Sequence, residues 1–114
     1  MKRWFLALLL GCGNPADTDA LVECDDAPVV TWDNFGAGFV LENCQPCHAS
    51  SAADRHDAPE DVIFDSEADV ALWAQEILER AASEDPTMPP QGGVEEDDRI
   101  RLATWLTCYP PVAQ

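Results

Sequence analysis

The five residues Cys44-Gln45-Pro46-Cys47-His48 constrain this chain more than any other stretch of it. Two thiols three positions apart, on the last turn of a helix, can each bond to one vinyl group of a porphyrin, and the next residue then offers an imidazole to the iron. Cys-x-x-Cys-His is the attachment pattern of a c-type haem. We therefore expect one covalent haem c, attached at Cys44 and Cys47, with His48 as its proximal ligand.

Two other kinds of site use paired cysteines. A thioredoxin-like redox pair normally follows a buried strand in a βαβ unit, whereas the segment before Cys44 has a helical pattern with glycines. A zinc site needs a second ligand pair at suitable spacing, and Cys24, Cys108 and His56 do not form one. The sequence favours haem over both alternatives.

The wider pattern, from residue 32 to residue 108, resembles the monohaem class I cytochrome c domains. Those domains have a helix leading into the haem motif, a middle helix, a Met-Pro loop and a C-terminal helix with an aromatic residue near its end. The corresponding segments here are 32–43, 67–82, Met88-Pro89-Pro90 and 95–107. The resemblance implies an all-α chain with the small cytochrome c fold, in which three main helices pack around one covalent haem.

The same resemblance implies the second axial ligand. In the cytochrome c family, a methionine followed by proline at this place is the sixth ligand of the iron, and Met88 lies 40 positions after His48. Prolines on both sides of Met88 stiffen its backbone. His56, in a polar loop, is the alternative ligand, and a solvent-exposed surface histidine is its simpler interpretation.

Several other residues suit a haem pocket. Arg55 and Arg80 are candidates for pairing with the haem propionates, although exposed arginines are common. Residues 62–64 form a short apolar run that we expect to pack against the porphyrin or the core, and a brief strand is one option there. Three tryptophans suit either the pocket or the core: Trp32, Trp73 and Trp105.

Local patterns predict where the helices begin and which faces they bury. Thr31 or Asp33 can cap the first helix, and Gly36 allows another helix to approach closely, a contact that the cytochrome c family makes with its C-terminal helix. Ser66 and Asp69 have the spacing of a capping box, and apolar residues follow at helical spacing. The residues expected on the buried side of the last helix are Ile100, Ala103, Trp105 and Leu106.

The N-terminus resembles a bacterial lipoprotein signal peptide. Lys2-Arg3 precedes an apolar run of seven residues, far fewer than the roughly 20 that a membrane-spanning helix needs, and Gly11-Cys12 follows. In that family the cysteine becomes the lipidated first residue of the mature protein; an ordinary secretory signal with an incidental cysteine is the alternative. We expect a signal peptide at 1–11, lipidation at Cys12, a flexible acidic tether at 12–28 and a cytochrome c domain at 29–114.

The chain is strongly acidic. Its formal net charge is −16, and the segment from residue 12 onward keeps four arginines and all 22 acidic residues, which gives −18 with no lysine. Such a charge argues against binding to nucleic acid, or to anionic lipid through basic patches. It suits redox protein partners with a basic docking surface, although a solvated acidic surface explains it more simply. Membrane contact is expected through the N-terminal lipid only.

The remaining cysteines, Cys24 and Cys108, are predicted to form a disulfide. An exported chain meets an oxidising compartment, where such bonds persist. The bond would close a loop of 84 positions, which loop-closure reasoning values at about 4 kcal/mol. Two unpaired thiols are the alternative.

These expectations together predict an electron carrier and not an enzyme. Ligation by His48 and Met88 raises the reduction potential relative to two nitrogen ligands and leaves no open position on the iron for oxygen or peroxide. The sequence thus predicts a lipid-anchored protein that faces the periplasm of a bacterium and exchanges single electrons with redox partners. The alternatives are a haem enzyme or gas sensor with a displaceable Met88, and a structural module whose haem only supports the fold.

Overall fold

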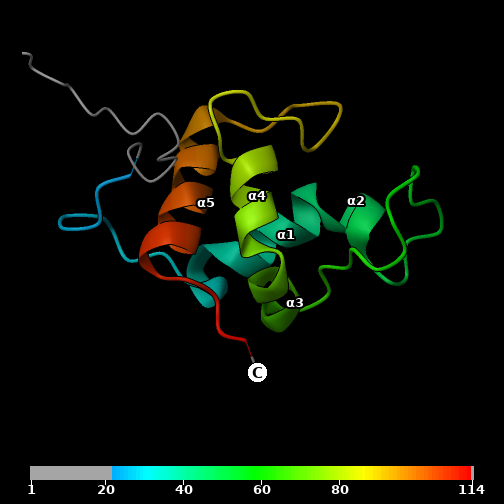
Figure 1. The fold of residues 1–114 in the computed structure, drawn as a ribbon, viewed down its shortest axis with the longest axis horizontal. Helices are drawn as coiled ribbons and strands as arrows, with labels where there is room; N and C mark the ends of the chain where they lie inside the picture. The colour runs from blue at the N-terminus through cyan, green and yellow to red at the C-terminus, as the bar shows by residue number, and fades with distance from the viewer. Residues whose placement is uncertain (1–21, 114) are drawn as a thin grey trace, which may run out of the picture.

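The computed structural model describes residues 22–113, in which the chain folds into helices joined by loops and forms no strand (Figure 1). The helical segments are η2 (Trp32–Gly36), α1 (Ala37–Asn43), α2 (Gln45–His48), α3 (Glu67–Leu72), α4 (Ala74–Ala81) and α5 (Glu96–Cys108). The all-α expectation is confirmed for this part of the chain, and the strand considered at 62–64 is not formed. The expected signal peptide, Cys12 and the start of the tether lie outside the described residues.

The first helix begins with a wide turn. Thr31 caps it, because its Oγ1 accepts a hydrogen bond from the N–H of Asn34 at 3.2 Å while its own N–H donates to Asn34 Oδ1 at 2.7 Å. In η2 the N–H of Gly36 donates to the carbonyl of Thr31 at 3.0 Å, the five-residue spacing of a π-helix. α1 then continues to Asn43. The helix predicted over 32–43 is therefore confirmed, with Thr31 as its cap.

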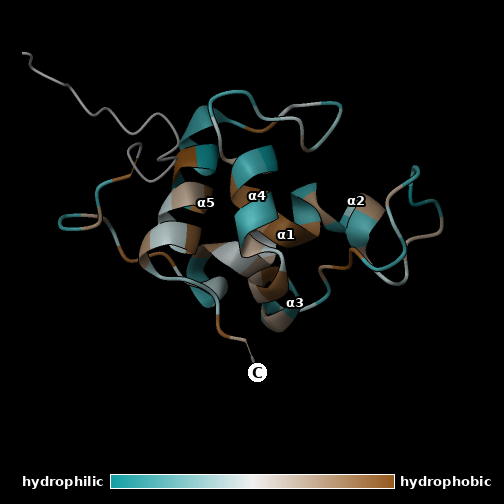
Figure 2. Ribbon diagram, viewed as in Figure 1, coloured by the Kyte–Doolittle hydropathy of each residue, from teal (hydrophilic) through white to brown (hydrophobic). Residues whose placement is uncertain are grey.

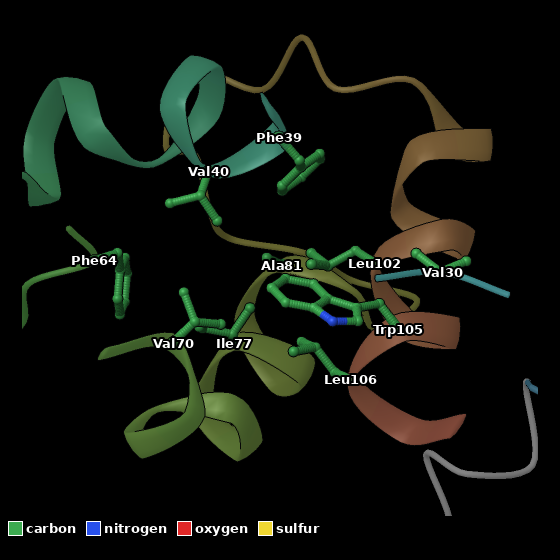
Figure 3. Packing of buried hydrophobic residues seen from close by; sticks show 10 residues of the cluster. All are labelled: Val30, Phe39, Val40, Phe64, Val70, Ile77, Ala81, Leu102, Trp105 and Leu106. Carbon is green, nitrogen blue, oxygen red and sulfur yellow. The ribbon is translucent and has the colours of Figure 1, made fainter. Parts of the chain in front are cut away.

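Gly36 is the point at which η2 meets α5. A methyl group on Gly36 would lie 2.6 Å from Cη2 and 2.8 Å from Cζ2 of Trp105, closer than packed atoms approach. The Trp105 side chain is completely buried and lies in the middle of the core in Figure 3, and Trp32 packs against it with ring centroids 6.0 Å apart. The expected close approach of the first and last helices is confirmed.

The core is built from the inner faces of α1, α3, α4 and α5. Figure 3 shows these side chains converging, and Figure 2 shows hydrophilic residues on the side of α4 that faces the viewer. The buried cluster consists of Val30, Phe39, Val40, Phe64, Val70, Ile77, Ala81, Leu102, Trp105 and Leu106. Burial of these apolar surfaces is the main force that holds the helices together.

The middle helix departs from the expectation of one helix over 67–82. The structure divides it into α3 and α4 at Trp73, whose φ of −113° and ψ of 14° leave the helical region. The capping box of Ser66 and Asp69 is present as predicted. Val70 and Ile77, on either side of the break, are both buried, so the apolar spacing continues across it and gives no sign that the helix is interrupted.

The last helix buries three of the four residues predicted for its inner side, Ala103, Trp105 and Leu106, but not Ile100. Ile100, expected on the buried side, is 53% exposed, and Leu102 takes the core position at 1%. Successive residues of an α-helix are turned by about 100°, so Ile100 and Leu102 point to nearly opposite sides. The buried face is set by Leu102, Trp105 and Leu106, which have helical spacing among themselves.

The two ends of the described chain are tied together. A disulfide joins Cys24 to Cys108, which confirms the predicted pairing. Next to it, the hydroxyl of Tyr109 donates a hydrogen bond to the carbonyl of Ala27 at 3.0 Å. The segment before η2 is thereby fixed to the end of α5. Within residues 22–113, no helix combines the length and apolar character needed to span a membrane.

Candidate functional site

A cavity of about 490 Å³ lies between α1, α2, α4 and the loops that follow α2 and α4. In Figure 1 these loops form the right and upper edges of the molecule. Cys44, Cys47, His48 and Met88 all line this cavity. Much of its remaining wall is apolar and consists of Phe39, Val62, Phe64, Trp73, Ile77 and Ala81. The volume is within the range of about 300–1,000 Å³ that is typical of ligand and cofactor sites.

The Cys-x-x-Cys-His segment lies at a junction of two helices. Cys44 ends α1 by donating its N–H to the carbonyl of Val40 at 2.9 Å, and it also precedes α2, which has Pro46 in its first turn. The carbonyl of Cys44 then accepts the N–H of His48 at 2.8 Å. One helical turn therefore presents Cys44, Cys47 and His48 to the cavity.

The imidazole of His48 is held by residues 62–64. Its Nδ1 lies 3.0 Å from the carbonyl oxygen of Val62, and because a carbonyl only accepts, Nδ1 is the donor; in the neutral imidazole Nε2 then has a free lone pair. Phe64 packs beside the ring with centroids 4.9 Å apart, and its N–H donates to the carbonyl of His48 at 2.8 Å. Metal-ligating histidines are oriented in this way by a partner on the other ring nitrogen.

Both thiols of the motif are free. Burial raises the pKa of the Cys44 thiol to about 12, so that this side chain is a neutral and poorly nucleophilic thiol near pH 7. A thioredoxin-like redox pair needs a thiolate of lowered pKa in a βαβ unit. The Cys44 thiol instead has a raised pKa, and residues 22–113 contain no strand from which a βαβ unit could be built.

Met88 is held in place through its backbone. Its N–H donates to the carbonyl of Arg80 at 2.9 Å, and its own carbonyl accepts Nη1 of Arg99 at 2.9 Å. The same Nη1 donates to the carbonyl of Ala81 at 2.6 Å, at the end of α4. Arg99 of α5 thus fixes the loop that brings Met88 to the cavity. No local sequence signal marks Arg99 for this role, because its contacts span 11 and 18 positions.

Arg55 is the most extensively bonded charged residue of the cavity wall. Its guanidinium donates to the carbonyls of Ala49 at 2.9 Å, Pro59 at 2.7 Å and Val62 at 3.1 Å. Its Nε is buried and has no hydrogen-bond partner. An unsatisfied buried donor of this kind is uncommon.

The other predicted pocket residues divide between the cavity and the core. Arg80, Trp73 and His56 line the cavity. The His56 side chain is 66% exposed, and its Nδ1 lies 3.7 Å from a carboxylate oxygen of Asp54. Trp32 and Trp105 instead pack together in the core. Core packing therefore accounts for Trp32 and Trp105, whereas Trp73 lies at the cavity and also packs against the buried cluster.

Comparison of the chain with family models, with curated proteins and with solved structures gives no match. Within the described residues, no three side chains of His, Cys, Asp or Glu come together as a metal site. A zinc-type centre needs such a cluster, whereas a centre held by an imidazole and a thioether uses only one residue of these four types, the histidine.

Proposed function

We propose that this protein is a small c-type cytochrome that carries one haem and passes single electrons. The observation that carries the proposal is the shared cavity, where two thiols and an imidazole from the α1–α2 junction border the same space as Met88. These are the groups that covalent attachment and His/Met ligation require. The proposal includes a cytochrome c fold for residues 29–114.

The residues present at the cavity suit a haem. Nε2 of His48 is available as a ligand atom, since Nδ1 is already bonded to Val62. The apolar walls suit the faces of a porphyrin. Arg55 brings a guanidinium to the cavity wall. A propionate carboxylate is an acceptor of suitable charge for this guanidinium.

Each residue has a separate task in this proposal. Cys44 and Cys47 would hold the porphyrin through thioether bonds, while His48 Nε2 and the Met88 sulfur would ligate the iron. The apolar side chains exclude water, and the thioether ligand favours the ferrous state. The haem, when bound, supplies reversible one-electron chemistry. Because His48 and Met88 would both ligate the iron and leave no site for a substrate, a carrier is favoured over an enzyme.

The proposal extends to where the protein works. An exported chain lipidated at Cys12 would stand on a membrane facing the periplasm, with residues 12–28 as its tether. Such an anchor raises the local concentration of the carrier near a membrane-bound redox partner. The acidic surface suits a partner with a basic docking surface.

Expression together with a haem-maturation system tests the proposal. The purified protein is expected to be coloured, with haem that resists extraction under denaturing conditions. Cys44→Ala/Cys47→Ala should lose the covalent haem, whereas the matched pair Cys24→Ala/Cys108→Ala should retain it. A colourless protein whose Cys44 and Cys47 both react with an alkylating agent after denaturation would contradict the proposal.

Absorption of the ferric form identifies the distal ligand. A thioether–iron band in the red region should be present in the wild type, lost in Met88→Ala and kept in His56→Ala. Absence of this band from the wild type, with a ferric spectrum that His56→Ala changes and Met88→Ala does not, would assign ligation to His56. Rapid binding of carbon monoxide to the ferrous wild type would instead favour a haem enzyme or gas sensor with a displaceable Met88.

A further inference from the structure

The carbonyl oxygen of Val62 is approached by two donors. Nδ1 of His48 lies 3.0 Å from it, and Nη2 of Arg55 lies 3.1 Å from it. The guanidinium is locked in place by the carbonyls of Ala49 and Pro59. The permanently charged guanidinium of Arg55 therefore donates to the same carbonyl oxygen that accepts the hydrogen bond from the His48 imidazole.

We infer that Arg55 is a positioning residue that raises the reduction potential of the iron by weakening the hydrogen bond from His48 to Val62. This inference rests on the proposed function. A carbonyl that accepts an imidazole N–H makes that imidazole a stronger electron donor. A guanidinium on the same oxygen withdraws electron density from it, so His48 donates less to the metal. Weaker donation favours the ferrous over the ferric state, which raises the potential.

Arg55 also affects the reduction potential in two ways that do not involve the carbonyl of Val62, and the experiment has to distinguish them. Its positive charge disfavours a ferric centre by Coulomb repulsion, and pairing of its guanidinium with a propionate changes the charge near the iron. Neither route alters the bond between His48 and Val62. Arg80 provides the control, since it lines the same cavity with the same charge but is not bonded to Val62 in the described structure.

The holoprotein and three variants, Arg55→Gln, Arg55→Lys and Arg80→Gln, are to be compared by redox titration and by NMR of the ferrous form with ¹⁵N-labelled histidine. In Arg55→Gln the equilibrium constant for reduction should fall about tenfold, which is about 59 mV for a one-electron couple. The Nδ1 proton of His48 should move downfield as its bond to Val62 strengthens. In Arg80→Gln this proton should not move.

Arg55→Lys keeps the charge but lacks the planar fork that reaches three carbonyls. It should still shift the Nδ1 proton and give a smaller fall in potential. An unmoved Nδ1 proton in both Arg55 variants overturns the inference, whatever the potential does. Loss of haem from both variants assigns Arg55 to folding and also overturns it. A colourless wild type, by contrast, is the failure of the proposed function itself.

Discussion

At the scale of single residues, two glycines of the first helix have opposite structural roles. Gly36 faces Trp105 with no room for a methyl group, whereas an atom added at Gly38 would meet nothing within 4 Å. Gly36→Ala should therefore destabilise the fold by about 1–3 kcal/mol, the usual cost of overpacking. Gly38→Ala should stabilise it by about 0.5–1 kcal/mol, because alanine is the better helix former. Thermal unfolding of the two variants checks both signs, and equal effects would contradict the helix contact.

A second prediction at this scale concerns Asp65 and pH. Hydrogen bonds from the side chain and the backbone of Ser50 lower the pKa of Asp65, and the positive charge of Arg55 contributes. A lowered folded-state pKa stabilises the fold above the unfolded value of about 3.9 and loses this effect as pH falls through the folded value. Asp65→Asn should therefore be less stable than wild type at pH 6–7, and the difference should shrink below about pH 4.

Thermal denaturation of Asp65→Asn between pH 2.5 and 7 measures this difference. Asp85→Asn, which alters an exposed carboxylate in the loop after α4, is the matched control and should track the wild type throughout. A difference between Asp65→Asn and wild type that stays constant over the whole range would argue against a lowered pKa.

At the scale of elements, the contact between α5 and the Met88 loop has a testable consequence. Arg99→Gln leaves the carbonyls of Ala81 and Met88 without their charged donor, which should cost about 1–3 kcal/mol of stability. If the protein carries the proposed haem, a looser loop should also let added imidazole displace Met88 faster from the ferric iron. Arg101→Gln is the control, because Arg101 is largely exposed and meets Asp98 only at 3.9 Å. Unchanged displacement kinetics in Arg99→Gln would show that the loop is held by other contacts.

The disulfide between the N-terminal segment and α5 should stabilise the fold mainly through the unfolded chain. Cys24 and Cys108 are 84 positions apart, and a closed loop of this length is worth about 4 kcal/mol in the chain-entropy account. Cys24→Ala/Cys108→Ala should lower the free energy of unfolding by up to that amount. Chemical denaturation of oxidised, reduced and substituted protein measures it. The reduced wild type should match the double variant, and a reduced protein as stable as the oxidised one would be inconsistent with the role assigned to the bond.

At the scale of the whole molecule, the sequence predicted the helices better than the cavity. Apolar spacing and capping residues are local signals, and they located the helical segments, the Thr31 cap and the close approach at Gly36. The break at Trp73 left no such signal, because Val70 and Ile77 remain buried on both sides of it. The contacts of Arg99 with Met88, and of Arg55 with Val62, run from side chain to backbone carbonyl. Any residue type supplies a carbonyl, so these contacts depend on the folded arrangement and not on a motif.

The acidic charge of the whole chain gives a final prediction about electron exchange by the haem-loaded protein of the proposed function. From residue 12 onward, the chain has four arginines and 22 acidic residues. Three of these acids, Asp57, Asp61 and Glu76, line the cavity itself. A cationic redox reagent should therefore be drawn to the protein and an anionic reagent repelled. Raising the ionic strength from 0.01 to 0.15 M shortens the Debye length from about 30 to about 8 Å. Stopped-flow rates with the cationic reagent should fall over this range, while those with the anionic reagent should rise. The variant Glu76→Gln, which removes one negative charge, should weaken both trends. If the rate with the cationic reagent did not depend on salt, the acidic surface would have no part in electron exchange.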